Sequence, residues 1–197
     1  MTNPIKKLYL VRHAQPAIAK GICYGCSDIA VEAKPEQDLI NALRLTLARD
    51  TLIAASPLQR CLSTANALHA LGWAEPIVDD RLAEMDFGDW EGVAWNDIKR
   101  SQIDAWAEDI VNYRPPGGES VKDVATRALS AMADLSFDED VALITHAGVI
   151  QILTKLLRKQ ALEDFSSKQF EFGSITLLER SVDSKGIVTF SLASGGD

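Results

Sequence analysis

Residues 7–16 of the chain, KLYLVRHAQP, contain the feature that most limits what it can fold into. Residues 8–11 form an apolar run without polar alternation, which is typical of a strand buried on both faces of a parallel sheet. The strand should stop at Arg12-His13, since Pro16 follows closely and cannot extend it. Ligands of open α/β sheets bind at the carboxyl ends of the strands. Arg12 and His13 are therefore either a solvated strand end or part of a binding site.

The charge balance and the hydropathy exclude several classes of protein. The 197-residue chain has a formal net charge of -8, which argues against non-specific nucleic-acid binding through Lys and Arg but leaves room for a small basic pocket. No apolar run approaches the roughly 20 residues that span a bilayer, and the run after Lys6-Lys7 is too short for a signal peptide. We expect a cytoplasmic protein without a nucleic-acid or membrane partner, and the sequence carries no indication of its oligomeric state.

The chain has three cysteines, Cys23, Cys26 and Cys61. An odd number does not indicate a disulfide framework. Cys23 and Cys26 match C-x-x-C, but the glycines around them favour a loop, and a zinc site would need a second ligand pair. The sequence thus predicts an ordinary loop here, no metal site and no cofactor.

Short apolar runs alternate with segments of helical periodicity along most of the chain. Strands are predicted at 8–11, 51–55, 76–78, 140–144, 174–179 and 187–192, the last two as a hairpin, and helices at 36–49, 58–71, 119–135 and 149–157. Ser56 is the expected N-cap of the second helix, with Pro57 at its first position. This alternation predicts an α/β fold, a three-layer α/β/α sandwich around a mostly parallel sheet.

Residues 81–118 interrupt this alternation. They hold three of the four tryptophans and many acidic residues, and they end in Pro-Pro-Gly-Gly. We expect one domain over residues 1–197, with residues 85–118 forming an inserted, mostly helical cap. Residues 14–35 are predicted to form a long loop, and loops of this length are commonly functional.

Basic side chains follow three of the predicted strands. Arg12-His13 ends the first, His146 follows the fourth, and Arg60 lies in the first helical turn after the second. In a parallel sheet these ends meet at one edge, where each pair of like charges costs about 4 kcal/mol at 4 Å and an effective dielectric near 20. A phosphate dianion would convert this repulsion into attraction, aided by arginine forks and helix N-termini. The alternative is three unrelated strand ends.

The segment LYLVRHAQP resembles the signature L-x-x-x-R-H-G-E/Q-T of the histidine phosphatase superfamily, which has the phosphoglycerate mutase-like fold. Four further segments fit in the family's order: SPLQRCLSTA (56–65), RLAEMDFGDWEG (81–92), PGGES (116–120) and ITHAG (144–148). The combination of CYG-x-x-D, EMDFGDWEG and PPGGES is most similar to the α-ribazole phosphatase branch, which serves cobalamin biosynthesis. The resemblance implies hydrolysis of a small phosphomonoester through a phosphohistidine, without a cofactor.

The resemblance also implies roles for individual residues. His13 would be the nucleophile, Glu84 the general acid and base, and four residues would bind the phosphate, namely Arg12, Arg60, His146 and Ala147. Attack requires a neutral imidazole, which nearby cations favour. An incoming phosphate dianion works against this, so one ring N–H of His13 should have a fixed backbone acceptor. Asp86 is the rival acid, and Asp28 a more distant one.

The sequence departs from the family pattern after the nucleophile. Ala14 replaces a glycine, Gln15-Pro16 replaces Glu-Thr, and Ala19 stands where an asparagine would donate to phosphate. These changes leave the substrate open, with α-ribazole 5′-phosphate, a broad-specificity range or phosphoglycerate mutation as alternatives, although mutases of this fold are generally longer. A phospholigand-binding protein without turnover is the non-enzymatic alternative.

Overall fold

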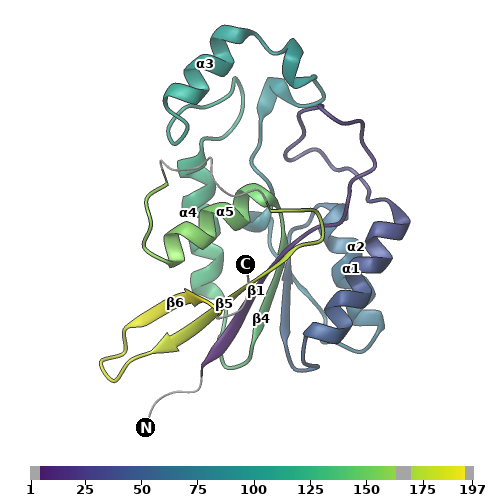
Figure 1. Cartoon of the computed structure of the whole chain (residues 1–197), viewed down its shortest axis with the longest axis vertical. Coiled ribbons are helices and arrows are strands. Elements are labelled where there is room, and N and C mark those ends of the chain that lie inside the picture. Colours follow the sequence, from purple (N-terminus) through teal and green to yellow (C-terminus); the bar gives the residue numbers. More distant parts are fainter. Residues whose placement is uncertain (1–4, 163–169, 194–197) are drawn as a thin grey trace.

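The computed structural model describes residues 5–162 and 170–193, and in this part of the chain six strands form one sheet (Figure 1). The strand order is β3-β2-β4-β1-β5-β6. The parallel part consists of β1 (Lys6–Arg12), β2 (Leu52–Ala55), β3 (Ile77–Val78) and β4 (Val141–Thr145). The antiparallel part consists of β5 (Ile175–Val182), paired with β1, and β6 (Val188–Leu192), which forms a hairpin with β5. The mostly parallel sheet and the terminal hairpin are thus confirmed.

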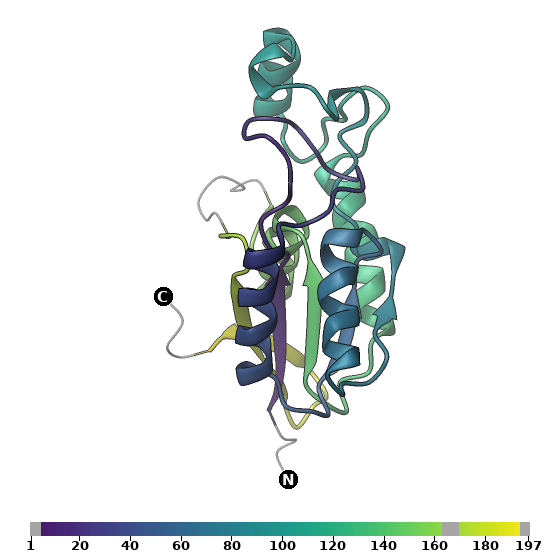
Figure 2. The same ribbon diagram turned by 90° about the vertical axis from the view of Figure 1, so that its right-hand side faces the viewer.

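Helices cover both faces of the sheet and make the predicted three layers. On one face lie α1 (Ala33–Thr46) and α2 (Gln59–Ala70), and on the other α4 (Val121–Asp134) and α5 (Ala147–Leu157) (Figures 1 and 2). Each face has its own apolar core, because the fully buried strands direct alternate side chains to the two sides. No helix in the described residues is both long and apolar enough to cross a membrane.

The predicted cap of α2 is wrong. The helix begins at Gln59, and Ser56 is buried with its hydroxyl on the ring of His146 instead. The Asp28 carboxylate, which comes from the long loop, accepts a hydrogen bond from the Gln59 N–H at 2.7 Å. A distant carboxylate therefore satisfies the free N–H group that a local cap would normally satisfy.

Residues 83–118 and the loop after β1 extend together beyond the carboxyl end of the sheet (Figure 1). This region contains α3 (Arg100–Glu108) and the 3₁₀ turns Gly88–Trp90 and Trp95–Asp97, while Asp80–Leu82 forms another 3₁₀ turn before it. Helix thus makes up only part of this region, and the division into one domain with a cap at residues 85–118 stays a prediction. The loop is fastened to it by Cys23, which exchanges 2.8 Å backbone hydrogen bonds with Val93 and Gly92.

Candidate active site

The ends of β1 and β4 bring two histidines together. Arg12 pairs with Thr145 in the parallel ladder, and the His13 N–H donates to the Thr145 carbonyl at 3.1 Å. His13 and His146 are therefore the next residues on neighbouring strands, with ring centroids 5.2 Å apart. The sheet register itself produces this contact between residues 133 positions apart in the chain.

His13 is held as a neutral imidazole. Its side chain is buried, and Nδ1 lies 2.7 Å from the Ala14 carbonyl, so that nitrogen carries the proton and donates it. Burial lowers the pKa of His13 to about 3, with the Ala14 hydrogen bond opposing the shift and Arg60 and Arg12 adding to it. The backbone acceptor that the chemistry required is thus present, and the lone pair of Nε2 is left for another partner.

Arg60 is fully buried at the start of α2. Its two terminal nitrogens donate to the carbonyls of Ser27 at 2.7 Å and Gly25 at 2.5 Å, and its Nε donates to Nδ1 of His146 at 3.2 Å. Only glycine fits at position 25, because an added Cβ would lie 1.9 Å from the Met85 carbonyl oxygen. The long loop therefore holds the guanidinium, which keeps two N–H groups unused by these bonds.

Arg12 lies against the segment that precedes β5. Its Nη1 donates to the Phe170 carbonyl at 2.5 Å, and its guanidinium carbon lies 3.6 Å from the ring centroid of Phe172. Its Nε is buried and has no hydrogen-bond partner among the described residues. A buried guanidinium N–H without an acceptor is costly, and an anion would supply the acceptor.

His146 has both ring nitrogens on protein partners. Nδ1 accepts from Arg60, so Nε2 carries the proton and donates to the Ser56 hydroxyl at 2.8 Å. Burial lowers the pKa of His146 well below its ordinary value, and the charge of Arg60 adds to this. In this geometry His146 orients Arg60, and its role as a direct phosphate ligand stays a prediction.

Glu84 is the carboxylate that reaches the turn between β4 and α5. Its Oε2 accepts from the Gly148 N–H at 3.2 Å, and its Oε1 accepts from the Met85 N–H at 3.0 Å. The rivals are turned elsewhere: Asp86 accepts from the Gly88 N–H at 2.7 Å, and Asp28 caps α2. Of the three carboxylates considered, only Glu84 contacts the residues beside His146.

Ala147 is the first residue of α5, so its N–H points out of the helix start without an intrahelical acceptor. It follows His146 and precedes the glycine that binds Glu84. The backbone at this turn can thus add a donor to the two guanidinium groups, as the sequence predicted, although its contact with phosphate stays a prediction.

Sequence reasoning missed four contributors. The carbonyls of Gly25, Ser27 and Phe170 and the ring of Phe172 hold the two guanidinium groups, and no spacing in the sequence indicated them. Trp90, Trp95 and Trp106 pack on one another with ring centroids 5.8 to 6.3 Å apart and form the apolar core of the region beyond the sheet.

The C-x-x-C pair lies in a loop, as predicted, with Cys23 buried and Cys26 exposed, both as free thiols. The sulfur of Cys26 and carboxylate oxygens of Asp86 and Glu91 lie within 4.8 Å of one another. Burial and the neighbouring Glu91 raise the pKa of Cys26 to about 12, and Glu91 already accepts from the backbone of Cys26, Ser27 and Phe87. These contacts fasten the loop to residues 87–91.

At its carboxyl edge the sheet brings together two adjoining histidines, the buried guanidinium of Arg60, the half-buried guanidinium of Arg12 and a carboxylate. This set of groups is typical of phosphoryl-transfer enzymes that use a histidine. Comparison with known protein families shows which family the chain belongs to. The chain belongs to the histidine phosphatase superfamily, whose branch 1 model matches residues 8–192, and it is a phosphatase of that superfamily.

Individual relatives have different substrates in their names. The glucosyl-3-phosphoglycerate phosphatase of Mycolicibacterium vanbaalenii is 30% identical over 168 residues, which cover 78% of this chain and 74% of that protein. The native structure of the mycobacterial enzyme of the same name superposes with a TM-score of 0.82 at 26% identity over 96% of this chain and 98% of that one. The α-ribazole phosphatase of Shigella flexneri has a TM-score of 0.80 at 22% identity over 94% and 95% of the two chains, an agreement in fold alone.

Proposed function

We propose that the chain hydrolyses small phosphomonoesters through a phosphohistidine on His13. The observation that carries the proposal is the buried Nε of Arg12, which has no acceptor among the described residues. The next residue is His13, whose imidazole is neutral and hydrogen-bonded to the backbone. A phosphoryl group bound there would accept from Arg12, from the unused N–H groups of Arg60 and from the Ala147 N–H, and those donors would stabilise its equatorial oxygens in the transition state.

In the first step, Nε2 of His13 attacks phosphorus and the bond from phosphorus to the ester oxygen breaks. An alkoxide is a poor leaving group, so Glu84 gives its proton to that oxygen as it departs. The Nδ1 hydrogen bond to the Ala14 carbonyl fixes the ring and stabilises the charge that develops on it.

In the second step, water attacks the phosphohistidine in line with the nitrogen. Glu84, now a carboxylate, takes the proton from this water, the bond from phosphorus to Nε2 breaks, and inorganic phosphate leaves. The hydrogen bond from the Gly148 N–H supports the carboxylate form that this step requires.

The substrate in this proposal is a phosphomonoester of a small alcohol. α-Ribazole 5′-phosphate is one candidate, supported by the motifs of residues 23–28, 84–92 and 115–120. A phosphorylated glycerate derivative is another, supported by the relatives of 26% to 30% identity. A panel of both, with phosphoserine and 3-phosphoglycerate, would rank them by kcat/KM, and phosphate transfer to a second hydroxyl would identify a mutase instead.

The three histidines of the chain allow a matched test of the nucleophile. We expect His13→Gln to lower hydrolysis of p-nitrophenyl phosphate by on the order of 1,000-fold or more, with EDTA present in every assay. His69→Gln is the control, because His69 lies on α2 and contacts the Trp73 carbonyl outside the site. Quenching with alkaline detergent after mixing with phosphate-labelled substrate should trap alkali-stable, acid-labile phosphate on wild type and on His69→Gln but not on His13→Gln. Equal rates in the two variants would refute the assignment, and phosphate binding without turnover in wild type would favour a binding protein.

A further inference from the structure

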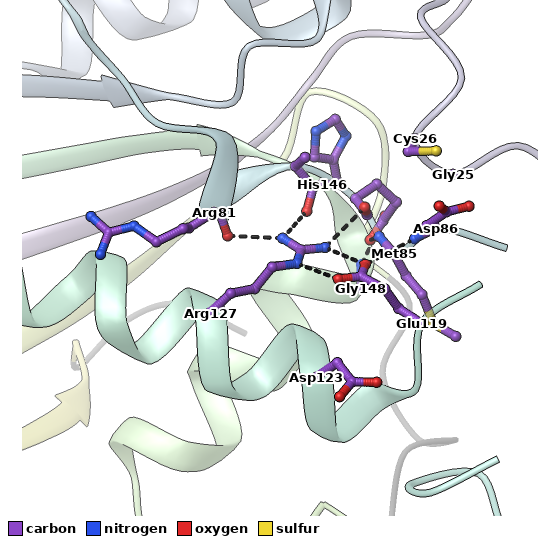
Figure 3. A network of polar contacts seen from close by, with 12 residues as sticks. Gly25, Cys26, Arg81, Met85, Asp86, Glu119, Asp123, Arg127, His146 and Gly148 are labelled. Carbon is purple, nitrogen blue, oxygen red and sulfur yellow. Dashed lines mark hydrogen bonds and ion pairs between the residues drawn. The ribbon is translucent and has the colours of Figure 1, made fainter. Parts of the chain in front are cut away.

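Arg127 and Glu119 form an ion pair next to residues 81–86, the segment that includes Glu84 (Figure 3). Glu119 lies just before α4, and Arg127 lies within it. Nε and Nη2 of Arg127 donate to the two carboxylate oxygens of Glu119, each at 2.9 Å. The pair has the bidentate geometry that fixes a guanidinium in one orientation.

The remaining three N–H groups of Arg127 all go to backbone carbonyls of one short segment. Nη1 donates to the carbonyls of Arg81 at 2.8 Å and Ala83 at 2.6 Å, and Nη2 donates to the carbonyl of Glu84 at 3.0 Å. All five donors of the guanidinium are therefore used. The carbonyl that Arg127 leaves out, that of Leu82, accepts from the Thr145 hydroxyl at 2.7 Å.

Glu119 holds the other end of the same segment. Its Oε2 accepts from the Asp86 N–H at 3.1 Å, and its own N–H donates to the Asp86 carbonyl at 2.8 Å. The backbone on both sides of Glu84 is thus bonded to the ion pair, while the Glu84 side chain is directed to the N-terminus of α5.

We propose that Arg127, oriented by Glu119, is a positioning residue that holds Glu84 at the distance required for proton transfer to the leaving group. This inference rests on the proposed function, in which Glu84 is the general acid. The physical argument is that a misplacement of about 1 Å can cost 100-fold in rate, and that four successive carbonyls, those of residues 81–84, each have a fixed donor from a side chain. A lysine at position 127 would keep the positive charge but could not supply five N–H donors in the planar arrangement of a guanidinium.

Leaving-group dependence separates this role from a merely structural one. p-Nitrophenolate departs without a proton, whereas an alkyl phosphate such as glycerol phosphate needs the acid. We therefore expect Arg127→Met to lower kcat/KM, which reports the first step and not the hydrolysis of the phosphohistidine, about 10- to 100-fold more for the alkyl ester than for the aryl ester. Arg127→Lys and Glu119→Gln should also raise the ratio of aryl to alkyl rates, by smaller amounts. These milder variants test the proposal if Arg127→Met does not fold.

Arg81→Met is the matched control. The Arg81 side chain also ties this region to α4, through Asp134 and Ser130, but it is directed away from Met85 and Asp86 (Figure 3), and its carbonyl is unaffected by the substitution. We expect an unchanged ratio of aryl to alkyl rates in this variant. Equal loss on both esters in Arg127→Met, or the same shift in Arg81→Met, would overturn the proposal.

Glu84→Gln distinguishes failure of the inference from failure of the proposed function. Glu84→Gln should raise the ratio of aryl to alkyl rates, and adding Arg127→Met to it should raise the ratio no further, because both changes act on one proton transfer. If Glu84→Gln leaves the ratio unchanged, Glu84 is not the acid. If Glu84→Gln raises it while Arg127→Met does not, Glu84 keeps its role and the positioning by Arg127 is refuted.

Discussion

Gly148 allows Glu84 to approach the start of α5, and replacing it with alanine should separate activity from stability. An added Cβ would lie 2.5 Å from Oε1 of Glu84 and 3.3 Å from its carboxyl carbon. Ordinary contact begins at 3.4 Å, so the carboxylate has to move by about 1 Å, a displacement that can cost 100-fold in rate. The hydrogen bond from the Gly148 N–H, now 3.2 Å, would lengthen at the same time.

The effect on stability should be small because its two parts oppose each other. Alanine is favoured over glycine inside a helix by about 1 kcal/mol. The clash falls on the end of a flexible side chain rather than on backbone, and the weakened hydrogen bond costs about as much as the helix gains. We expect the free energy of unfolding to stay within about 1 kcal/mol of the wild-type value.

Two measurements check this prediction. Urea unfolding gives the change in stability, and kcat/KM on an alkyl phosphomonoester and on p-nitrophenyl phosphate gives the change in the first chemical step. We expect kcat/KM on the alkyl ester to fall about 100-fold and kcat/KM on the aryl ester to fall much less. Wild-type activity on both esters in a folded Gly148→Ala protein would refute the role of the contact between Gly148 and Glu84.

Three further predictions concern the neutral imidazole of His13, the loop that holds Arg60 and the start of α2. Burial lowers the pKa of His13 to about 3 from 6.5, so the unfolded chain binds the extra proton between these values and stability falls as the pH drops through this window. The loss attributable to His13 is about 2 kcal/mol at pH 5; urea unfolding at pH 8 and pH 5 should show a weaker pH dependence in His13→Gln, and an identical one would contradict the prediction. Glu91→Gln should raise KM on the order of 10-fold with kcat nearly unchanged, since the loop backbone that Glu91 fastens also holds Arg60; steady-state kinetics with an unaltered KM would count against it. Asp28→Ala should lower the free energy of unfolding by about 1 kcal/mol, because the Gln59 N–H loses its acceptor; denaturant titration measures this, and unaltered stability would show that water replaces the cap.

Much of the sheet follows from local pattern. The apolar runs at 8–11 and 141–144 predict buried strands, and both are completely covered in the structure apart from the slightly exposed Tyr9. Parallel pairing of these strands makes the residues that follow them meet, which is why the sequence predicts that His13 and His146 lie together. Helix boundaries were less accurate, because contacts from elsewhere decide where a helix begins.

The class of fold and the residue types at one edge of the sheet follow from the sequence, since hydrophobic periodicity depends on neighbours along the chain. The order of the strands and the groups that each side chain contacts are known only from the folded structure. In the folded chain the Ser56 hydroxyl binds His146, and Asp28 caps α2. The N–H of Gly148, 64 positions along the chain, binds Glu84 rather than Asp86. These choices depend on backbone atoms brought together by folding, and no spacing in the sequence encodes where a carbonyl or an N–H will point.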